Sequence, residues 1–127
     1  MPKILNLKKK SFLVYGLGST GCSIIKYFKK NKIINYSVWD DSIRLRKKFK
    51  NKVASNLFNS LKKVDFIVLS PGISLKKTKY KRALIKLRKK IITDIDLLFL
   101  SNSKLKTIVV TGTNGKSTTC KIIAHLL

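Results

Sequence analysis

Short apolar runs alternate with amphipathic, lysine-rich segments along the whole chain. The apolar runs are nearly continuous, which is typical of strands buried on both faces of a parallel sheet. They predict strands at 11–15, 33–39, 64–69, 91–92 and 105–110, and a weaker candidate at 52–55. Apolar positions at helical spacing predict one helix that ends near Asn31 and further helices at 43–49, 78–90 and 95–100. A last helix is predicted after residue 115. This alternation predicts a Rossmann-like, doubly wound α/β fold with a mostly parallel sheet.

A polar break at Ser101-Asn102-Ser103 marks the expected boundary between two domains. Residues 1–103 contain enough strands and helices for one complete α/β domain, and Asp94 is expected to be the N-cap of its last helix. Residues 104–127 supply only a strand, a glycine-rich loop and a helix. They are therefore expected to be the start of a second α/β domain of the phosphate-loop type.

The first strand runs into a G-x-G-x-x-G turn at residues 16–21. In such a turn Gly16 lets the backbone reverse, Gly18 leaves no Cβ in the way of a diphosphate, and Gly21 lets the next helix pack closely on the sheet. The free N–H groups near Ser19 and Thr20 would face the anion. The turn therefore predicts a ligand that carries a diphosphate; the alternative is a tight strand-to-helix turn that binds nothing.

Polar loops follow the apolar runs at 33–39 and 64–69. Asp40-Asp41-Ser42 closes the run at 33–39, and Ser70-Pro71-Gly72 closes the run at 64–69. Ligands of doubly wound sheets bind outside the carboxyl ends of the strands, so both loops and the 16–21 turn are expected to meet there. Pro71 and Gly72 predict a rigid turn. For the two aspartates, capping of the strand end is the alternative to ligand binding.

A second phosphate-binding motif follows the strand predicted at 105–110. Thr111 to Thr119 reads T-G-T-N-G-K-S-T-T, with Val110 where the general motif has its first glycine. In this motif the loop N–H groups surround phosphate, Lys116 places a charge on the terminal phosphates, and the Ser117 hydroxyl reaches Mg²⁺. The sequence therefore predicts a nucleoside-triphosphate site.

The formal net charge of +24 raises the question of nucleic-acid binding. The basic residues are 25 Lys and 4 Arg, whereas sites that read bases or fork phosphates favour Arg. The lysines are also spread over every predicted helix and loop, so we expect a solvated surface and no specific nucleic-acid partner. No uncharged apolar run is long enough to span a membrane, and no membrane insertion is expected.

Three further side chains are expected to be structural. Cys22 and Cys120 stand alone in predicted helices, which favours small core or half-buried residues in a reducing cytoplasm over a disulfide or a zinc site. His125, the single histidine, lies on the apolar side of the last helix and is expected to pack there.

The phosphate loop T-G-T-N-G-K-S-T resembles that of the Mur ligases, ATP-dependent enzymes that form amide bonds in peptidoglycan precursor synthesis and thereby serve cell-wall biogenesis and division. Three further motifs, G-L-G-S-T-G at 16–21, S-P-G-I at 70–73 and D-I-D-L-L-F at 94–99, resemble the members that add D-glutamate to UDP-N-acetylmuramoyl-L-alanine. The resemblance covers that family's first domain and only the opening of its second.

The resemblance implies a role for each motif. Gly18, Ser19 and Thr20 would hold the uridine diphosphate. Asp40 and Asp41 would hold the uracil end, and Gly72 another part of the nucleotide-sugar. The implied ATP site is Gly112, Thr113, Asn114, Gly115, Lys116, Ser117 and Thr118, with Ser117 on Mg²⁺ and Lys116 as the catalytic residue. Two departures from the family pattern are Asp41-Ser42, where Thr-Arg is frequent, and Asp96, where Glu is common.

The implied reaction converts the substrate carboxylate to an acyl phosphate, which the amine of D-glutamate attacks. The family members are cytoplasmic and act as monomers when full length. The remaining metal ligands and the D-glutamate site would lie outside these 127 residues, so this chain by itself is expected to be inactive.

Two other functions stay open at this point. A domain for NAD or FAD in an oxidoreductase would fit the 16–21 turn followed by Asp40, but it has no use for the loop at 111–119. A basic nucleic-acid-binding module is supported by charge alone.

Overall fold

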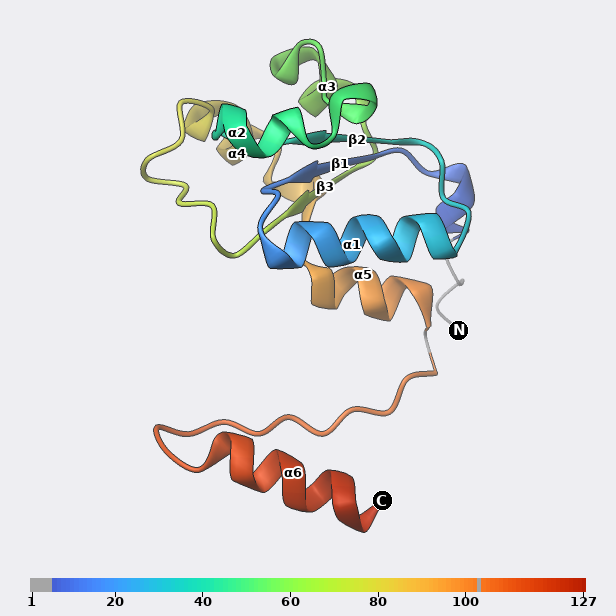
Figure 1. Cartoon of the computed structure of the whole chain (residues 1–127), viewed down its shortest axis with the longest axis vertical. Coiled ribbons are helices and arrows are strands. Elements are labelled where there is room, and N and C mark those ends of the chain that lie inside the picture. The colour runs from blue at the N-terminus through green and yellow to red at the C-terminus, as the bar shows by residue number, and fades with distance from the viewer. Residues whose placement is uncertain (1–5, 103) are drawn as a thin grey trace.

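The computed structural model describes residues 6–102 and 104–127. Its sheet has four parallel strands in the order β2-β1-β3-β4, shown in Figure 1. The strands are β1 (Phe12–Tyr15), β2 (Tyr36–Trp39), β3 (Phe66–Leu69) and β4 (Ile91–Ile92). Since β2 lies on one side of β1 and β3 on the other, the strand order reverses at β1. The carboxyl edge at such a switch point is where doubly wound sheets bind ligands.

Helices cover both faces of this sheet. Figure 1 shows α1 and α5 on one face and α3 and α4 on the other, while α2 lies beside the β2 edge and packs Leu45 toward the core under α1. The helices are α1 (Ser19–Lys30), α2 (Ile43–Lys47), α3 (Leu57–Lys63), α4 (Lys81–Lys86), α5 (Asp94–Ser101) and α6 (Lys116–Leu126). Short 3-10 turns stand at Leu7–Lys9, Lys50–Lys52 and Arg88–Lys90. The predicted doubly wound α/β fold is confirmed for the part of the chain that contains the sheet.

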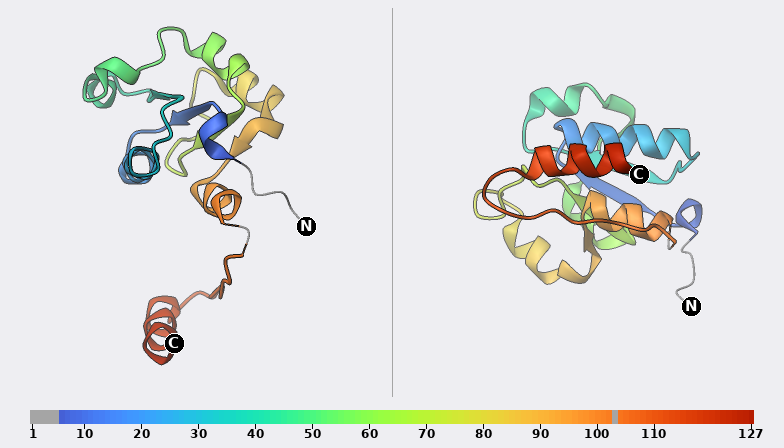
Figure 2. Two further views of the ribbon diagram at one scale, coloured as in Figure 1. Left: turned by 90° about the vertical axis from the view of Figure 1, so that its right-hand side faces the viewer. Right: turned by 90° about the horizontal axis from the view of Figure 1, so that it is seen from below.

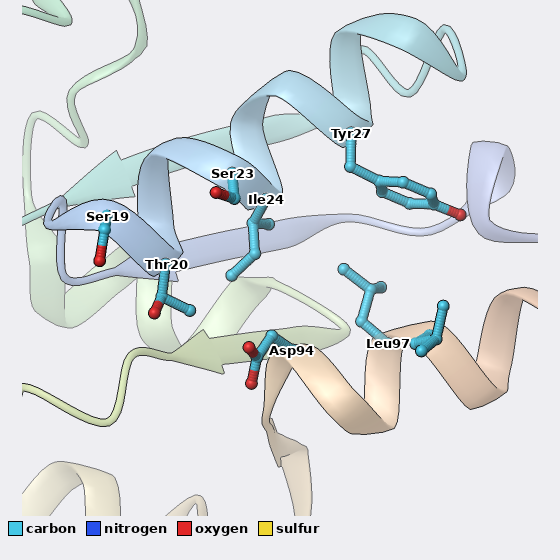
Figure 3. A pocket seen from close by; sticks show the side chains of 8 residues that line it. Ser19, Thr20, Ser23, Ile24, Tyr27, Asp94 and Leu97 are labelled. Carbon is cyan, nitrogen blue, oxygen red and sulfur yellow. The ribbon is translucent and has the colours of Figure 1, made fainter. Parts of the chain in front are cut away.

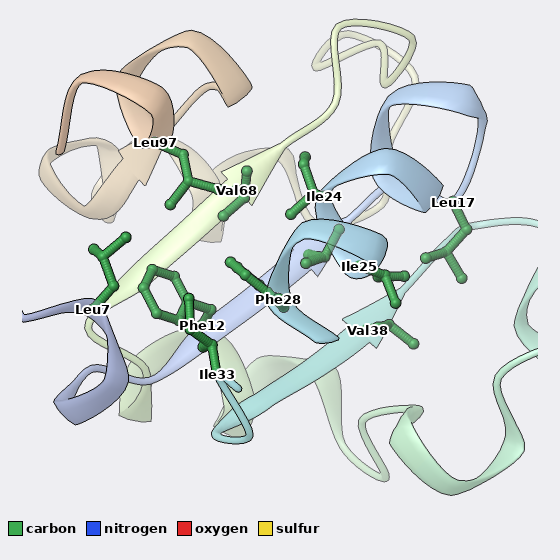
Figure 4. Close-up of a cluster of buried hydrophobic side chains, with 11 residues drawn as sticks. Leu7, Phe12, Leu17, Ile24, Ile25, Phe28, Ile33, Val38, Val68 and Leu97 are labelled. Carbon is green, nitrogen blue, oxygen red and sulfur yellow. The ribbon is translucent and has the colours of Figure 1, made fainter. Parts of the chain in front are cut away.

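The side chains of β1 build a core on each side of the sheet. Phe12 and Val14 belong to the cluster under α1 and α5, and Leu13 and Tyr15 to the cluster under α3 and α4. Figure 4 shows the first cluster, in which the rings of Phe12 and Phe28 lie 4.9 Å apart between centroids. All four β1 side chains are 0% exposed. The predicted burial on both faces is therefore confirmed, and each such side chain contributes about 1.5–3 kcal/mol to folding.

Some predicted strands are shorter than expected. The run at 33–39 forms a strand only from Tyr36, because Ile33 is used to close α1: its N–H donates to the Phe28 carbonyl at 2.9 Å. The strand predicted at 52–55 is wrong, since this segment makes a single parallel bridge between Val53 and Val38. The predicted strands at 11–15, 64–69 and 91–92 are confirmed within a residue or two.

The helices differ from the prediction at three places. α3 was not predicted, and the helix predicted at 78–90 is reduced to α4 followed by a 3-10 turn. Thr78 lies before α4, whose N-cap is Tyr80, and its hydroxyl lies 2.6 Å from that of Tyr15. The N-cap of α5 is Thr93 and not Asp94: Thr93 and Asp96 form a reciprocal capping box.

The C-terminal residues form no sheet of their own. Residues 105–110 run alongside α6 without strand pairing, so the predicted strand is not formed (Figures 1 and 2). A strand needs a hydrogen-bonded neighbour, and the described residues place none beside it. The predicted helix is confirmed as α6. Cys120 and His125 on it are exposed, which contradicts their expected packing, because no core lies beneath them. Cys22 is half-buried as expected.

The predicted domain boundary coincides with the end of α5 at Ser101. Ser103, the last residue of the predicted break, and residues 1–5 of the predicted first domain lie outside the described residues.

Candidate nucleotide-binding site

The turn after β1 needs glycine at two of its three glycine positions. Gly16 has φ +106°, and a Cβ there would lie 2.6 Å from the Ser70 Cβ. A Cβ at Gly21 would lie 1.9 Å from the Gly16 carbonyl oxygen, which is far inside van der Waals contact. Only the missing side chains let α1 begin directly against the end of β1. The roles predicted for Gly16 and Gly21 are therefore confirmed.

Gly18 and Gly72 are different, because nothing in the fold requires glycine there. Neither has a positive φ, and a Cβ built on either meets no atom within 4 Å. The turn at Ser70-Pro71-Gly72 thus does not depend on the conformational freedom of Gly72, contrary to the expectation from sequence. Both glycines face open space at the carboxyl edge of the sheet.

The start of α1 is electrostatically suited to an anion. Gly18 is its N-cap, no side chain caps it, and no acidic residue stands in its first turn. The first N–H groups of a helix lack partners within it, and the helix dipole adds a partial positive charge. This end of α1 can therefore hold a phosphate group.

A cavity of about 330 Å³ opens at this point. It brings together five of the six residues predicted to contact the uridine-diphosphate ligand: Gly18, Ser19, Thr20, Asp40 and Gly72. Its other lining residues are Gly16, Leu45, Ser70 and Ile73. The sequence analysis did not single out Leu45 or Ile73 as site residues, although Ile73 belongs to the S-P-G-I motif. Their side chains give the cavity apolar surface suited to a ring or a sugar face.

Asp40 lines the cavity, but its carboxylate is already engaged. One oxygen accepts the Leu17 N–H at 2.7 Å and the other accepts the Ser42 N–H at 2.8 Å, and the residue is buried. Asp40 thus ties the end of β2 to the glycine-rich turn. This geometry matches the alternative to ligand binding, in which the aspartate caps the end of the strand and fixes two loops.

Asp41 does not line the cavity. Its carboxylate accepts a hydrogen bond from the Tyr15 hydroxyl at 2.7 Å, and the same hydroxyl lies 2.6 Å from Thr78 Oγ1. Burial raises the pKa of the Tyr15 phenol well above its ordinary value, and the neighbouring Asp41 carboxylate raises it further. Tyr15 therefore stays protonated and acts as a hydrogen-bond donor to Asp41.

A second cavity, of about 380 Å³, lies between α1 and α5 and is drawn in Figure 3. It shares Ser19 and Thr20 with the first cavity. Apolar side chains from both helices, among them Ile24 and Leu97, form its floor, and the Asp94 carboxylate stands opposite Thr20. The sequence analysis did not predict it, because it depends on how α5 is placed against α1.

The residues predicted to bind ATP form an exposed loop before α6. Gly112 and Gly115 have φ of +146° and +78°, conformations that favour glycine. The Lys116 ammonium group folds back over the loop, donating to the carbonyls of Gly112 and Thr113. Lys116 and Ser117 open α6, so the loop backbone leads into a helix N-terminus as a phosphate loop requires.

A parallel sheet with a glycine-rich turn, a helix N-terminus and a cavity at its switch point is the arrangement of a Rossmann-like α/β domain. The chain matches the family described as Mur ligase MurD-like, N-terminal domain, over residues 10–93. Because this match covers more than half of the chain, the chain belongs to that family.

Its relatives include three proteins named UDP-N-acetylmuramoylalanine--D-glutamate ligase. The one from Rickettsia prowazekii (strain Madrid E) is 41% identical over 125 residues, which cover 94% of this chain and 27% of the relative. Those from Wolbachia sp. subsp. Brugia malayi (strain TRS) and Francisella philomiragia are 38% and 39% identical, covering 94% and 96% of this chain and 26% and 27% of the relatives. The chain therefore spans about a quarter of the length of these relatives. Within residues 6–102 and 104–127, no helix is both long and apolar enough to cross a membrane.

Proposed function

We propose that this chain is the N-terminal part of a ligase that joins D-glutamate to UDP-N-acetylmuramoyl-L-alanine at the expense of ATP. In this proposal residues 1–103 bind the UDP-linked substrate, and residues 104–127 begin the ATP-binding domain. The full-length enzyme would act as a cytoplasmic monomer in peptidoglycan synthesis. The names of the relatives and the family match support the reaction.

The observation that carries the proposal is the pair Gly18 and Gly72. Both are glycines that the backbone does not need, and both line the same cavity. A Cβ at either position would meet no protein atom within 4 Å, and a larger side chain would extend into the cavity that both glycines line. A bound diphosphate explains both glycines, because it has to approach the backbone closely there.

Within the cavity the ligand's diphosphate would accept hydrogen bonds from the N–H groups and hydroxyls of Ser19 and Thr20. The uridine would then lie toward Leu45 and Ile73, between the loops that follow β2 and β3. Asp40 would act by holding the turn in shape and not by direct hydrogen bonding, since both its oxygens accept backbone N–H groups.

This geometry also argues against the NAD or FAD alternative. Such domains use an acidic side chain after the second strand to bind the ribose hydroxyls. Here the Asp40 carboxylate is buried and occupied, and the Asp41 carboxylate binds Tyr15. These hydrogen bonds occupy both oxygens of Asp40 and one oxygen of Asp41, which leaves fewer acceptor positions for ribose hydroxyls.

The loop at 111–118 fits a nucleoside triphosphate in its glycines, its lysine and its helix start. Lys116 would exchange the loop carbonyls for the terminal phosphates, and Ser117 would ligate Mg²⁺. ATP supplies the phosphoryl group that activates the substrate carboxylate. The described residues 104–127 have no sheet around this loop, so we expect the 127-residue chain to catalyse no amide formation.

The proposal is tested by titrating the purified chain with UDP-N-acetylmuramoyl-L-alanine and following the fluorescence of Trp39, its single tryptophan. We expect saturable binding that Gly18→Val abolishes while the fold is retained, because the added Cβ meets no protein atom within 4 Å. Equal binding by the wild type and the folded variant would refute the assignment of this turn.

A further inference from the structure

Three buried polar side chains of the described residues all lie at the carboxyl edge of the sheet: Asp40, Ser70 and Thr78. Two of them tie a loop to the glycine-rich turn. Asp40 accepts the Leu17 N–H, and the Ser70 hydroxyl donates to the Gly16 carbonyl at 2.9 Å. The third, Thr78, is tied through Tyr15 to Asp41 and makes no contact with that turn.

The hydrogen bonds of this second group form a directional chain. The Asp41 carboxylate can only accept, so the Tyr15 hydroxyl donates to it. Tyr15 Oη is then the acceptor for the Thr78 hydroxyl, whose oxygen in turn accepts the Tyr80 N–H at 3.3 Å. Hydrogen bonds linked in one direction polarise and strengthen one another in a site of low dielectric.

This chain of hydrogen bonds joins the two loops that line the cavity after β2 and β3. Asp41 lies in the loop that leads to the lining residue Leu45, and Thr78 ends the loop that carries Gly72 and Ile73. Between them stands Tyr15, the last residue of β1, which is 0% exposed. Since Tyr15 is rigidly held in the sheet, its hydroxyl fixes how far apart the two loops can move.

We propose that Tyr15, Asp41 and Thr78 form a clamp that sets the width of the UDP cavity and so positions the loops for the nucleotide-sugar. This inference rests on the proposed function for the identity of the ligand. It assigns Asp41 the role of a positioning residue, in place of the uracil contact expected from the sequence. None of the three clamp side chains lines the cavity itself.

The test compares Tyr15→Phe, which removes only the hydroxyl, with Tyr36→Phe, which makes the same change at the opposite end of the sheet. We expect Tyr15→Phe to weaken binding of UDP-N-acetylmuramoyl-L-alanine about tenfold, the size of effect of one hydrogen bond to a charged group, with Tyr36→Phe unchanged. Thr78→Val, which breaks the other half of the clamp, should weaken it similarly. Asp41→Asn keeps an acceptor for Tyr15 but loses its charge, so its affinity should fall between those of the wild type and Tyr15→Phe.

Hydrogen exchange of the free chain supplies the second measurement, which does not depend on the ligand. In Tyr15→Phe the amides of residues 42 and 80 should exchange faster, while those of α1 keep their protection. If Tyr15→Phe binds the ligand as tightly as the wild type and only its melting temperature is lower, the hydrogen bonds of Tyr15 serve stability alone. That result would overturn the proposal. If the wild type itself binds no UDP ligand, the proposed function fails, and unchanged exchange at residues 42 and 80 would then overturn the clamp as well.

Discussion

Replacing Gly21 with alanine tests the packing that places α1 against the sheet. The added Cβ would lie 1.9 Å from the Gly16 carbonyl oxygen and 2.9 Å from its carbon, whereas ordinary contact begins at 3.4 Å. Helix α1 would have to move by about 1.5 Å, and it is held by buried Ile24, Ile25 and Phe28. The obstacle is backbone, so no side-chain rotation relieves it. We expect a cost at the upper end of overpacking, about 3 kcal/mol, against a gain of at most about 1 kcal/mol in helix propensity.

The net loss of about 2 kcal/mol corresponds to a decrease of roughly 8–16 °C in melting temperature for a domain of this size. Urea and thermal denaturation followed by circular dichroism measure it. Gly18→Ala is the matched control: it is the same substitution three residues earlier, where a Cβ meets no atom within 4 Å, so it should cost no more than the ~1 kcal/mol by which alanine is the poorer N-cap. Equal stability of Gly21→Ala and Gly18→Ala would refute the close approach of α1 to β1.

Three further predictions concern pH, polyanions and ATP. Hydrogen bonds from the Ser11 backbone and hydroxyl hold the pKa of Asp65 at about 2, below its ordinary 3.8. Asp65 thus contributes stability above pH 3.8 that is lost as the pH falls through 2, and Asp65→Asn should flatten the decrease in unfolding free energy over that window. Despite the net charge of +24, binding to duplex DNA should show no sequence preference and a salt slope below that of about six phosphate contacts, because the lysines are dispersed; a steeper slope in filter binding would contradict this. Calorimetry should give an ATP affinity no tighter than about millimolar for the 127-residue chain, since the loop before α6 lacks a surrounding sheet, and micromolar binding lost in Lys116→Ala would contradict it.

The sequence was sufficient for the parts of the fold that local chemistry determines. The run at 11–15 and the turn at 16–21 could be predicted because burial on both faces and the spacing of glycines leave few alternatives. The cavity could be anticipated for a similar reason, since carboxyl ends of parallel strands meet at one edge. Helix α3 was missed because Leu57 and Leu61 are its only buried positions, although Asn56 supplies a usable N-cap signal.

Contacts between distant residues could not be predicted in this way. The sequence placed Asp40 and Asp41 in one loop, but not the orientation that turns one toward Leu17 and the other toward Tyr15. The apolar run at 105–110 has strand composition, yet strand formation depends on a neighbour that lies elsewhere in a chain. Position 78 likewise has a helical pattern, but it lies before α4, where its hydroxyl meets that of Tyr15.

We propose above that the cavity at Gly18 and Gly72 binds the diphosphate of a uridine nucleotide-sugar. The most direct test of this proposal is nuclear magnetic resonance of the ¹⁵N-labelled chain during titration with UDP-N-acetylmuramoyl-L-alanine, and separately with NAD. We expect saturable changes in the amide chemical shifts of Gly18, Ser19 and Gly72 with the UDP ligand, at concentrations where NAD has no effect. Shifts confined to other residues, or equal shifts with NAD, would contradict it.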